Sequence, residues 1–264
     1  MYKGFNFKTR KSFDGYYESG IKLYNKFNTE TRKTIDKYVG TNGEINGSNL
    51  QEDWFPNIEA DIFLSHSHKD EGLAIRLAGF LYQEYNLVTF IDSCIWGYSN
   101  DLLKQIDNKY CWQPKSETYN YTQRNFSTSH VHMMLSTALI KMIDKCECIF
   151  FLNTENSVTK TEDLIKNTKT QKTYSPWIYS EINCINLIRK TPISQERKNK
   201  FTHKKIILKE QFSNNVPISY NIDYELTNLP ILNDNILDIW KQKNQSTKSK
   251  KTDCLDNLYL LYTK

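Results

Sequence analysis

Three short apolar runs lie in the middle of the chain, at residues 61–65, 87–92 and 147–153. Each has the length of a strand, and the segments between them carry apolar residues at three- and four-residue intervals, which is the period of an amphipathic helix. The runs are too continuous for an antiparallel sheet with one face in water. The pattern therefore predicts an α/β fold with a parallel central sheet, to which residues 204–208 add a fourth strand.

The segments on either side of these runs have other patterns. Residues 11–38 have the spacing of an amphipathic helix, and a turn-rich Asn/Gly segment follows it. Residues 241–251 are rich in Lys, Gln and Ser and precede a terminal apolar run that predicts an edge strand or a short helix. We therefore divide the chain into an N-terminal helical extension at 1–58, a core domain at 59–215 and a C-terminal accessory segment at 216–264.

Helix starts and loops can also be placed. Asp70 is the expected N-cap of the helix after the first run, and Ser175 with Pro176 in the first helical position predicts the start of another. Residues 93–99 are expected to form a loop, and the Tyr- and Asn-rich residues 108–128 an irregular insertion. A long basic loop is expected to precede Ser175.

Composition narrows the class of protein. The six cysteines have no paired spacing, which favours reduced thiols, and no apolar run approaches the roughly 20 residues of a membrane span. The N-terminus lacks the apolar region of a signal peptide, so we expect a cytoplasmic protein. The net charge of +5 is mild and accompanies a general enrichment in Asn, Ile and Tyr, so we expect no nucleic-acid partner. The histidines and cysteines lack the spacings of a zinc site, so no metal is expected.

Polar and aromatic side chains gather where the predicted strands end. Parallel sheets bind ligands outside the carboxyl ends of their strands, so these positions are candidates for a binding site. Trp177 and Glu181 are four residues apart on one predicted helix, so the indole and the carboxylate share a face. The remaining candidates follow the first two runs or open the third helix: Ser65, His66, Ser67, Asp92, Trp96, Tyr98 and His130.

These residues and their order resemble the bacterial Toll/interleukin-1 receptor (TIR) family. DIFLSHSHKDE at 61–71 is similar to the opening of a TIR domain, and FID, a Trp/Gly segment, the strand FFLN and then Ser-x-Trp-x-x-x-Glu follow in the family's order. The resemblance covers residues 61 to about 210. It implies a three-layer, flavodoxin-like TIR fold, in which residues 93–99 match the mobile BB loop that closes over substrate or contacts a neighbouring copy.

The resemblance also implies an activity. Bacterial TIR proteins of the Thoeris-like anti-phage type cleave the nicotinamide–ribose bond of NAD+, giving ADP-ribose or an ADP-ribose-derived signal for a downstream effector, with NAD+ as substrate and no further cofactor. Glu181 would be the catalytic carboxylate. Ser65, His66 and Ser67 would line the ribose or phosphate side, and Trp96, Tyr98 and Trp177 would stack on nicotinamide or adenine. A homo-oligomer would form on activation.

Several alternatives remain open at this stage. Glu181 taken by itself has the pattern of an exposed helical glutamate, and Trp177 that of a core residue. Ser65, Asp92 and His130 all lie near strand ends, as in a Ser/His/Asp hydrolase, but no Gly-x-Ser-x-Gly elbow supports that chemistry. A protein of another class, a non-catalytic TIR adaptor that signals by assembly, would share the same fold.

Overall fold

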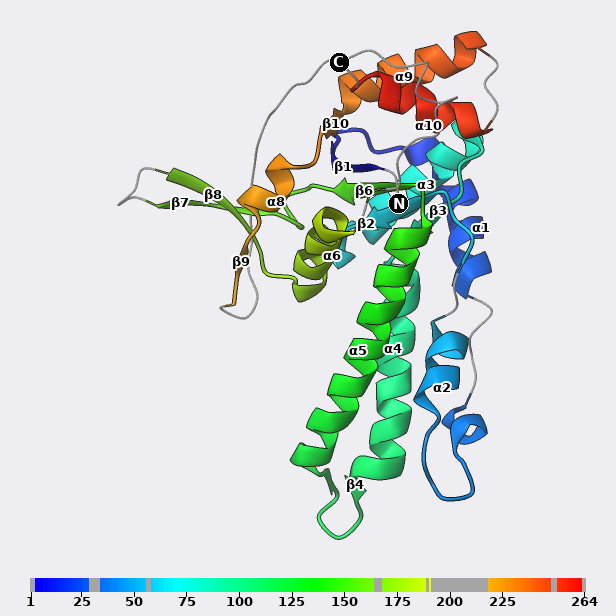
Figure 1. Cartoon of the computed structure of the whole chain (residues 1–264), viewed down its shortest axis with the longest axis vertical. Coiled ribbons are helices and arrows are strands. Elements are labelled where there is room, and N and C mark those ends of the chain that lie inside the picture. Colours follow the sequence, from blue (N-terminus) through cyan, green and yellow to red (C-terminus); the bar gives the residue numbers. More distant parts are fainter. Residues whose placement is uncertain are drawn as a thin grey trace. The chain divides into compact units, whose positions relative to one another are not determined.

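A five-stranded parallel sheet organises the chain (Figure 1). The structure is a computed structural model that describes residues 3–28, 34–55, 58–163, 168–188, 190, 218–247 and 251–262. The strands of the sheet, in spatial order, are β10 (Ile231–Asn233), β1 (Lys3–Lys8), β6 (Cys148–Leu152), β2 (Ile62–Ser65) and β3 (Thr89–Ile91). Every residue of β2, β3 and β6 is buried, as expected for a parallel sheet covered on both faces. The predicted α/β class and parallel sheet are confirmed, as are the strands predicted at 61–65, 87–92 and 147–153.

Two compact units divide the described chain. Unit 1 contains the sheet and comprises Met1–Tyr24, Glu59–Ile91 and Ile143–Lys264, and unit 2 comprises Asn25–Ile58 and Asp92–Met142. This division differs from the expected boundaries at 58 and 215, because unit 1 includes both ends of the chain. Within the described residues, no helix is long and apolar enough to cross a membrane.

The N-terminal segment corrects the sequence prediction. It is not only helical, because β1 (Lys3–Lys8) is an interior strand of the sheet, where it pairs with β6 on one side and β10 on the other. Phe5 and Phe7 are completely buried, and a Cβ atom on Gly4 would lie 2.6 Å from the side chain of Ile185. A six-residue strand with two lysines and a glycine has a weak local signal. Its place in the sheet depends on pairing with residues more than 140 positions away.

The C-terminal segment also belongs to the sheet unit. It supplies β10, and Trp240 is completely buried with its ring stacked on Tyr85 at 4.2 Å between centroids. The terminal apolar run forms a helix, the second of the two alternatives. The elements of this segment are α8 (Asp223–Thr227), β10, α9 (Asp234–Thr247) and α10 (Lys251–Leu260). The segment expected to be accessory therefore contributes a strand and buried side chains to unit 1.

The remaining elements of unit 1 are helices and a second, antiparallel sheet formed by β7, β8 and β9. A glycine allows a close approach between α1 and α3, since a Cβ on Gly20 of α1 would lie 1.8 Å from the backbone oxygen of Ile75 in α3. The basic segment expected as a loop instead contains an antiparallel hairpin, while the strand expected at 204–208 lies outside the described residues. These elements are η1 (Asp14–Tyr16), α1 (Tyr17–Asn28, which continues into unit 2), η3 (His68–Asp70), α3 (Glu71–Tyr85), β7 (Thr159–Asp163), β8 (Thr168–Thr173), α6 (Pro176–Leu187) and β9 (Tyr220–Asn221).

Unit 2 is built around a helical hairpin, α4 (Ser93–Ile106) and α5 (Tyr121–Lys145), whose last residues pass into unit 1. The expected loop at 93–99 is wrong, because α4 begins at Ser93, directly after the backbone of Asp92 enters the helical region. One glycine and no proline interrupt this segment, so the helix can form. The expected insertion is also ordered. The other elements of the unit are η2 (Ile35–Tyr38), α2 (Gly47–Trp54), the π-helical turn η4 (Asp107–Cys111), β4 (Trp112–Gln113) and β5 (Thr118–Tyr119).

A buried carboxylate ties the turn of this hairpin together. Asp107, which is 4% exposed, accepts hydrogen bonds from Arg124 Nε at 2.8 Å and from Ser127 Oγ at 2.5 Å. Ser127 also lies 3.9 Å from Cys111 Sγ. Residues 121–128, expected to be irregular, therefore form the first two turns of α5, held by a contact that no local pattern reveals.

Candidate functional site

A serine and a glutamate from two distant segments meet inside unit 1. Ser65 is the last residue of β2, and Glu181 lies in the middle of α6. The Ser65 hydroxyl donates a hydrogen bond of 2.6 Å to Glu181 Oε2, and the two residues are 0% and 2% exposed. A buried carboxylate is costly unless it is hydrogen-bonded, and this bond has the short length typical of a hydroxyl on a carboxylate. The structure thus brings together two residues predicted for the site.

The start of α6 determines where Glu181 lies. Ser175 is the N-cap, and its side chain accepts a hydrogen bond of 3.2 Å from the backbone of Ile178. Pro176 occupies the first helical turn, as predicted. Since this local motif begins the helix at a defined residue, the carboxylate is presented six residues after the cap, on the buried face.

The polar residues after β2 pass from the interior to the surface. His66 is completely buried, Ser67 is half-buried and His68 is exposed. His66 and Ser67 directly follow Ser65, the last residue of β2, so they lie at the carboxyl end of this strand. Ligands of open parallel sheets bind at this edge.

Asp70 has a different role from the one predicted. Its side chain makes no N-cap hydrogen bond to α3. It accepts hydrogen bonds from Thr154 Oγ1 at 2.5 Å and Asn156 Nδ2 at 2.7 Å, both from the loop after β6. Ser157 fixes the same loop by donating to the backbone oxygen of Leu152 at 2.9 Å. This network joins the segments that follow β2 and β6. The sequence did not predict it, because the network forms only when these two segments lie next to each other in the folded chain.

Strand β1 adds polar residues that the sequence did not predict for the site. Asn6 and Asn153 are both buried, and Asn153 Nδ2 donates to Asn6 Oδ1 at 2.8 Å. Among the described residues, no group donates a hydrogen bond to Asn153 Oδ1. Burial, together with the nearby charge of Lys160, lowers the pKa of Lys8 to about 8. The alternating Phe5 and Phe7 were the available signal for this strand.

Trp177 occupies the same helix as Glu181, four residues earlier, and is half-buried. Tyr179 of the same helix stacks on Tyr220 of β9 with 4.3 Å between ring centroids, but it lies two residues from both Trp177 and Glu181 and so on another side of α6. Trp177 is therefore the aromatic residue of α6 that shares a face with the carboxylate.

Four of the predicted site residues belong to unit 2. Asp92 is buried at the start of α4, and the side chain of Trp96 lies outside the described residues. Tyr98 is 6% exposed, and its hydroxyl donates to the backbone oxygen of Phe27 at 3.5 Å, so it packs inside unit 2. His130 lies on the exposed face of α5. Tyr98 is therefore a packing residue of its own unit, which corrects its predicted place on an open loop.

The thiols do not form a reactive or metal-binding group. None of the six cysteines forms a disulfide bond, and five of them are buried. Burial raises the pKa of Cys146 to about 12, so its thiolate form is disfavoured. Among the described residues, no three His, Cys, Asp or Glu side chains are placed to hold a metal ion.

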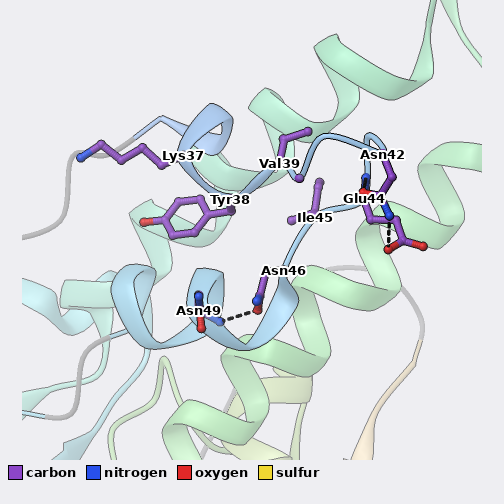
Figure 2. A pocket seen from close by; sticks show the side chains of 9 residues that line it. Lys37, Tyr38, Val39, Asn42, Glu44, Ile45, Asn46 and Asn49 are labelled. Carbon is purple, nitrogen blue, oxygen red and sulfur yellow. Dashed lines mark hydrogen bonds between the residues drawn. The ribbon is translucent and has the colours of Figure 1, made fainter.

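A hollow of about 410 Å³ lies in unit 2, lined by one continuous segment between Lys37 and Asn49 (Figure 2). Its polar groups already have structural partners. Asn42 Nδ2 donates to Glu44 at 2.7 Å, and Asn46 caps α2 by accepting from the backbone of Asn49 at 3.0 Å. Because these bonds stabilise the turn itself, a ligand is not needed to explain the polar side chains of the hollow. We therefore place the candidate site at the Ser65–Glu181 pair instead.

Comparisons of the chain with protein-family models, with curated proteins and with solved structures gave no match. The functional argument therefore depends on the site itself.

Proposed function

We propose that this chain is a TIR-type enzyme that cleaves the nicotinamide–ribose bond of NAD+, with Glu181 as its catalytic carboxylate. The observation that carries the proposal is the hydrogen bond of 2.6 Å between Ser65 and Glu181, two distant residues that both belong to the TIR-like motifs. The spatial order β3-β2-β6 at one side of the sheet fits a flavodoxin-like TIR core. The carboxyl end of β2 is the edge at which such sheets bind nucleotides.

The chemistry requires a negative group near the ribose. When the glycosidic C–N bond breaks, its electron pair leaves with the pyridinium nitrogen as neutral nicotinamide, and positive charge develops on the sugar. The Glu181 carboxylate stabilises this charge, and water then adds to the sugar carbon and releases a proton, giving ADP-ribose. Addition of another nucleophile in place of water gives a cyclised or conjugated product.

The neighbouring residues take supporting roles in this proposal. Ser65 orients the carboxylate through its hydroxyl, and His66 and Ser67 line the ribose or phosphate side. Trp177 offers its indole for stacking on a flat ring. Glu181 is 2% exposed, so NAD+ can reach it only after a local opening of the site. The helical start of α4 at Ser93 gives no support to a lid formed by residues 93–99.

The proposed biological setting depends on the family resemblance alone. Thoeris-like TIR proteins act in anti-phage defence, and their product signals to a separate effector. We propose the same role for this chain, with self-association on activation.

The test is NAD+ cleavage by the purified chain and by Glu181→Gln, followed by chromatography and mass spectrometry of the products. The amide keeps the shape and loses the charge, so we expect a loss on the order of a hundredfold or more. Glu155→Gln is the matched control, because it makes the same change at an exposed glutamate in the loop after β6. Unchanged activity in Glu181→Gln, with wild-type thermal unfolding, would contradict the catalytic assignment. A folded wild-type chain without cleavage at any concentration would favour the non-catalytic adaptor.

A further inference from the structure

The outer face of α5 carries large apolar side chains that the described part of the chain leaves exposed. Phe126 and Met133 are each 64% exposed and Ile140 is 39% exposed. They follow one another at seven-residue intervals, so they lie on one stripe of the helix. We call this stripe, with the small polar residues between its members, the α5 outer face.

The α5 outer face is not needed for the packing of unit 2. Its opposite face is the one that packs, since Val131, Leu135 and Leu139 are almost completely buried. Helices of globular proteins normally place charged residues on the solvent side. Here none of the residues 125–140 is Asp, Glu, Lys or Arg. An exposed apolar stripe without charges has the composition of an interface core.

The order of the side chains fits a second copy of the same helix. Phe126 and Ile140 are each seven residues from Met133, so the stripe is symmetric about that residue. In an antiparallel pair related by a two-fold axis, Met133 meets Met133, and each Phe126 meets an Ile140 of the other copy. Ser129 and Ser136 lie between these positions, and their small side chains allow the two helices to approach closely.

We propose that the α5 outer face is a homodimer interface in which two α5 helices pair antiparallel around Met133. The charges at its border agree with this register. Lys141 would lie opposite Asn125 of the other copy, so no like charges meet along residues 125–141. The proposal is independent of NAD+ cleavage and uses a different segment from residues 93–99.

The size of the face determines the strength of pairing. From Phe126 to Ile140 the helix is about 21 Å long, and a helix face is about 10 Å wide. Such a strip is well below the roughly 800 Å² that each partner buries in a standard interface. The dimer is therefore reversible and dissociates on dilution.

Sedimentation velocity of the full chain from about 1 to about 500 μM tests the pairing. We expect the wild-type chain to shift from monomer to dimer, and Met133→Asp to remain monomeric throughout, because it places two carboxylates in contact at the axis. His132→Asp is the matched control, since it adds the same charge at the adjacent exposed position off the stripe. A monomeric wild-type chain at every concentration overturns the proposal, as does Met133→Asp that dimerises like wild type.

Cysteine cross-linking tests the direction of pairing. Under mild oxidation, a mixture of Phe126→Cys and Ile140→Cys chains should form a covalent heterodimer, while each variant alone should cross-link no more than the wild type. Cross-linking of Phe126→Cys with itself would show a parallel pair and overturn the antiparallel register.

Discussion

The carboxyl edge of the sheet in unit 1 and the outer face of α5 in unit 2 depart from the usual distribution of residues in opposite directions. At the sheet edge, groups that prefer water are buried: Ser65, His66, Asn153 and Glu181 are all less than a tenth exposed. On α5, groups that avoid water are exposed, with Phe126 and Met133 each at 64%. A buried polar cluster and an exposed apolar stripe are the two departures that carry functional information.

The difference between these regions shows how each is stabilised. The buried polar groups have partners from distant segments, as Ser65 has in Glu181 and Asn6 has in Asn153. These bonds offset part of the cost of their desolvation. The apolar side chains of α5 find no such partner among the described residues of unit 2. The first region is therefore stabilised mainly by partners within its own chain, and a second copy is the partner that we propose for the second.

The largest effect should come from a tryptophan that belongs to neither region. Trp54 is 2% exposed in α2 of unit 2, so Trp54→Ala should lower the free energy of unfolding by about 3–5 kcal/mol. Trp177 is half-buried, so Trp177→Ala should cost much less stability and instead raise the KM for NAD+. Urea unfolding and steady-state kinetics of both variants measure the contrast. Equal losses of stability with equal kinetics would make Trp177 an ordinary core residue.

A smaller effect should follow from removing one partner of the buried pair. Ser65→Ala leaves the Glu181 carboxylate without its hydroxyl donor, which should cost about 1–3 kcal/mol of stability. Ser65→Thr keeps a hydroxyl and should recover part of that loss together with part of the cleavage activity. Chemical denaturation reports the first quantity and NAD+ consumption the second. If Ser65→Ala were as stable and as active as wild type, the hydrogen bond would have no role.

The smallest effect should be visible only as a dependence on pH. The pKa of Lys8 is lowered to about 8 in the folded chain, from an ordinary value of 10.5. Between these pH values the unfolded chain binds a proton that the folded chain has released, so this group makes stability rise with pH. Lys8→Met lacks this dependence. Its stability advantage over wild type should be greatest below pH 8 and shrink toward pH 10.5, as measured by urea unfolding at several pH values. A constant difference would contradict the lowered pKa.

Local patterns in the sequence determined a large part of unit 1. The continuous apolar runs predicted β2, β3 and β6, because a strand buried on both faces needs apolar residues at every position. Ser175 and Pro176 predicted the start of α6, because a helix N-terminus is satisfied by its own nearest residues. Together these signals placed Ser65 at the end of its strand and Glu181 on the helix that begins after Ser175, as candidates for one site.

Only the tertiary structure decided the rest. β1 has a weak local signal and β10 has only three residues, and the places of β1 beside β6 and of β10 beside β1 depend on pairing with strands far away in the chain. Asp70 could cap a helix or bind the loop after β6, and the position of that loop selected the second role. The exposed face of α5 became visible once Val131 and Leu135 were known to be the packed side. In each case the local signals allow several partners, and the choice among them depends on residues that only folding brings together.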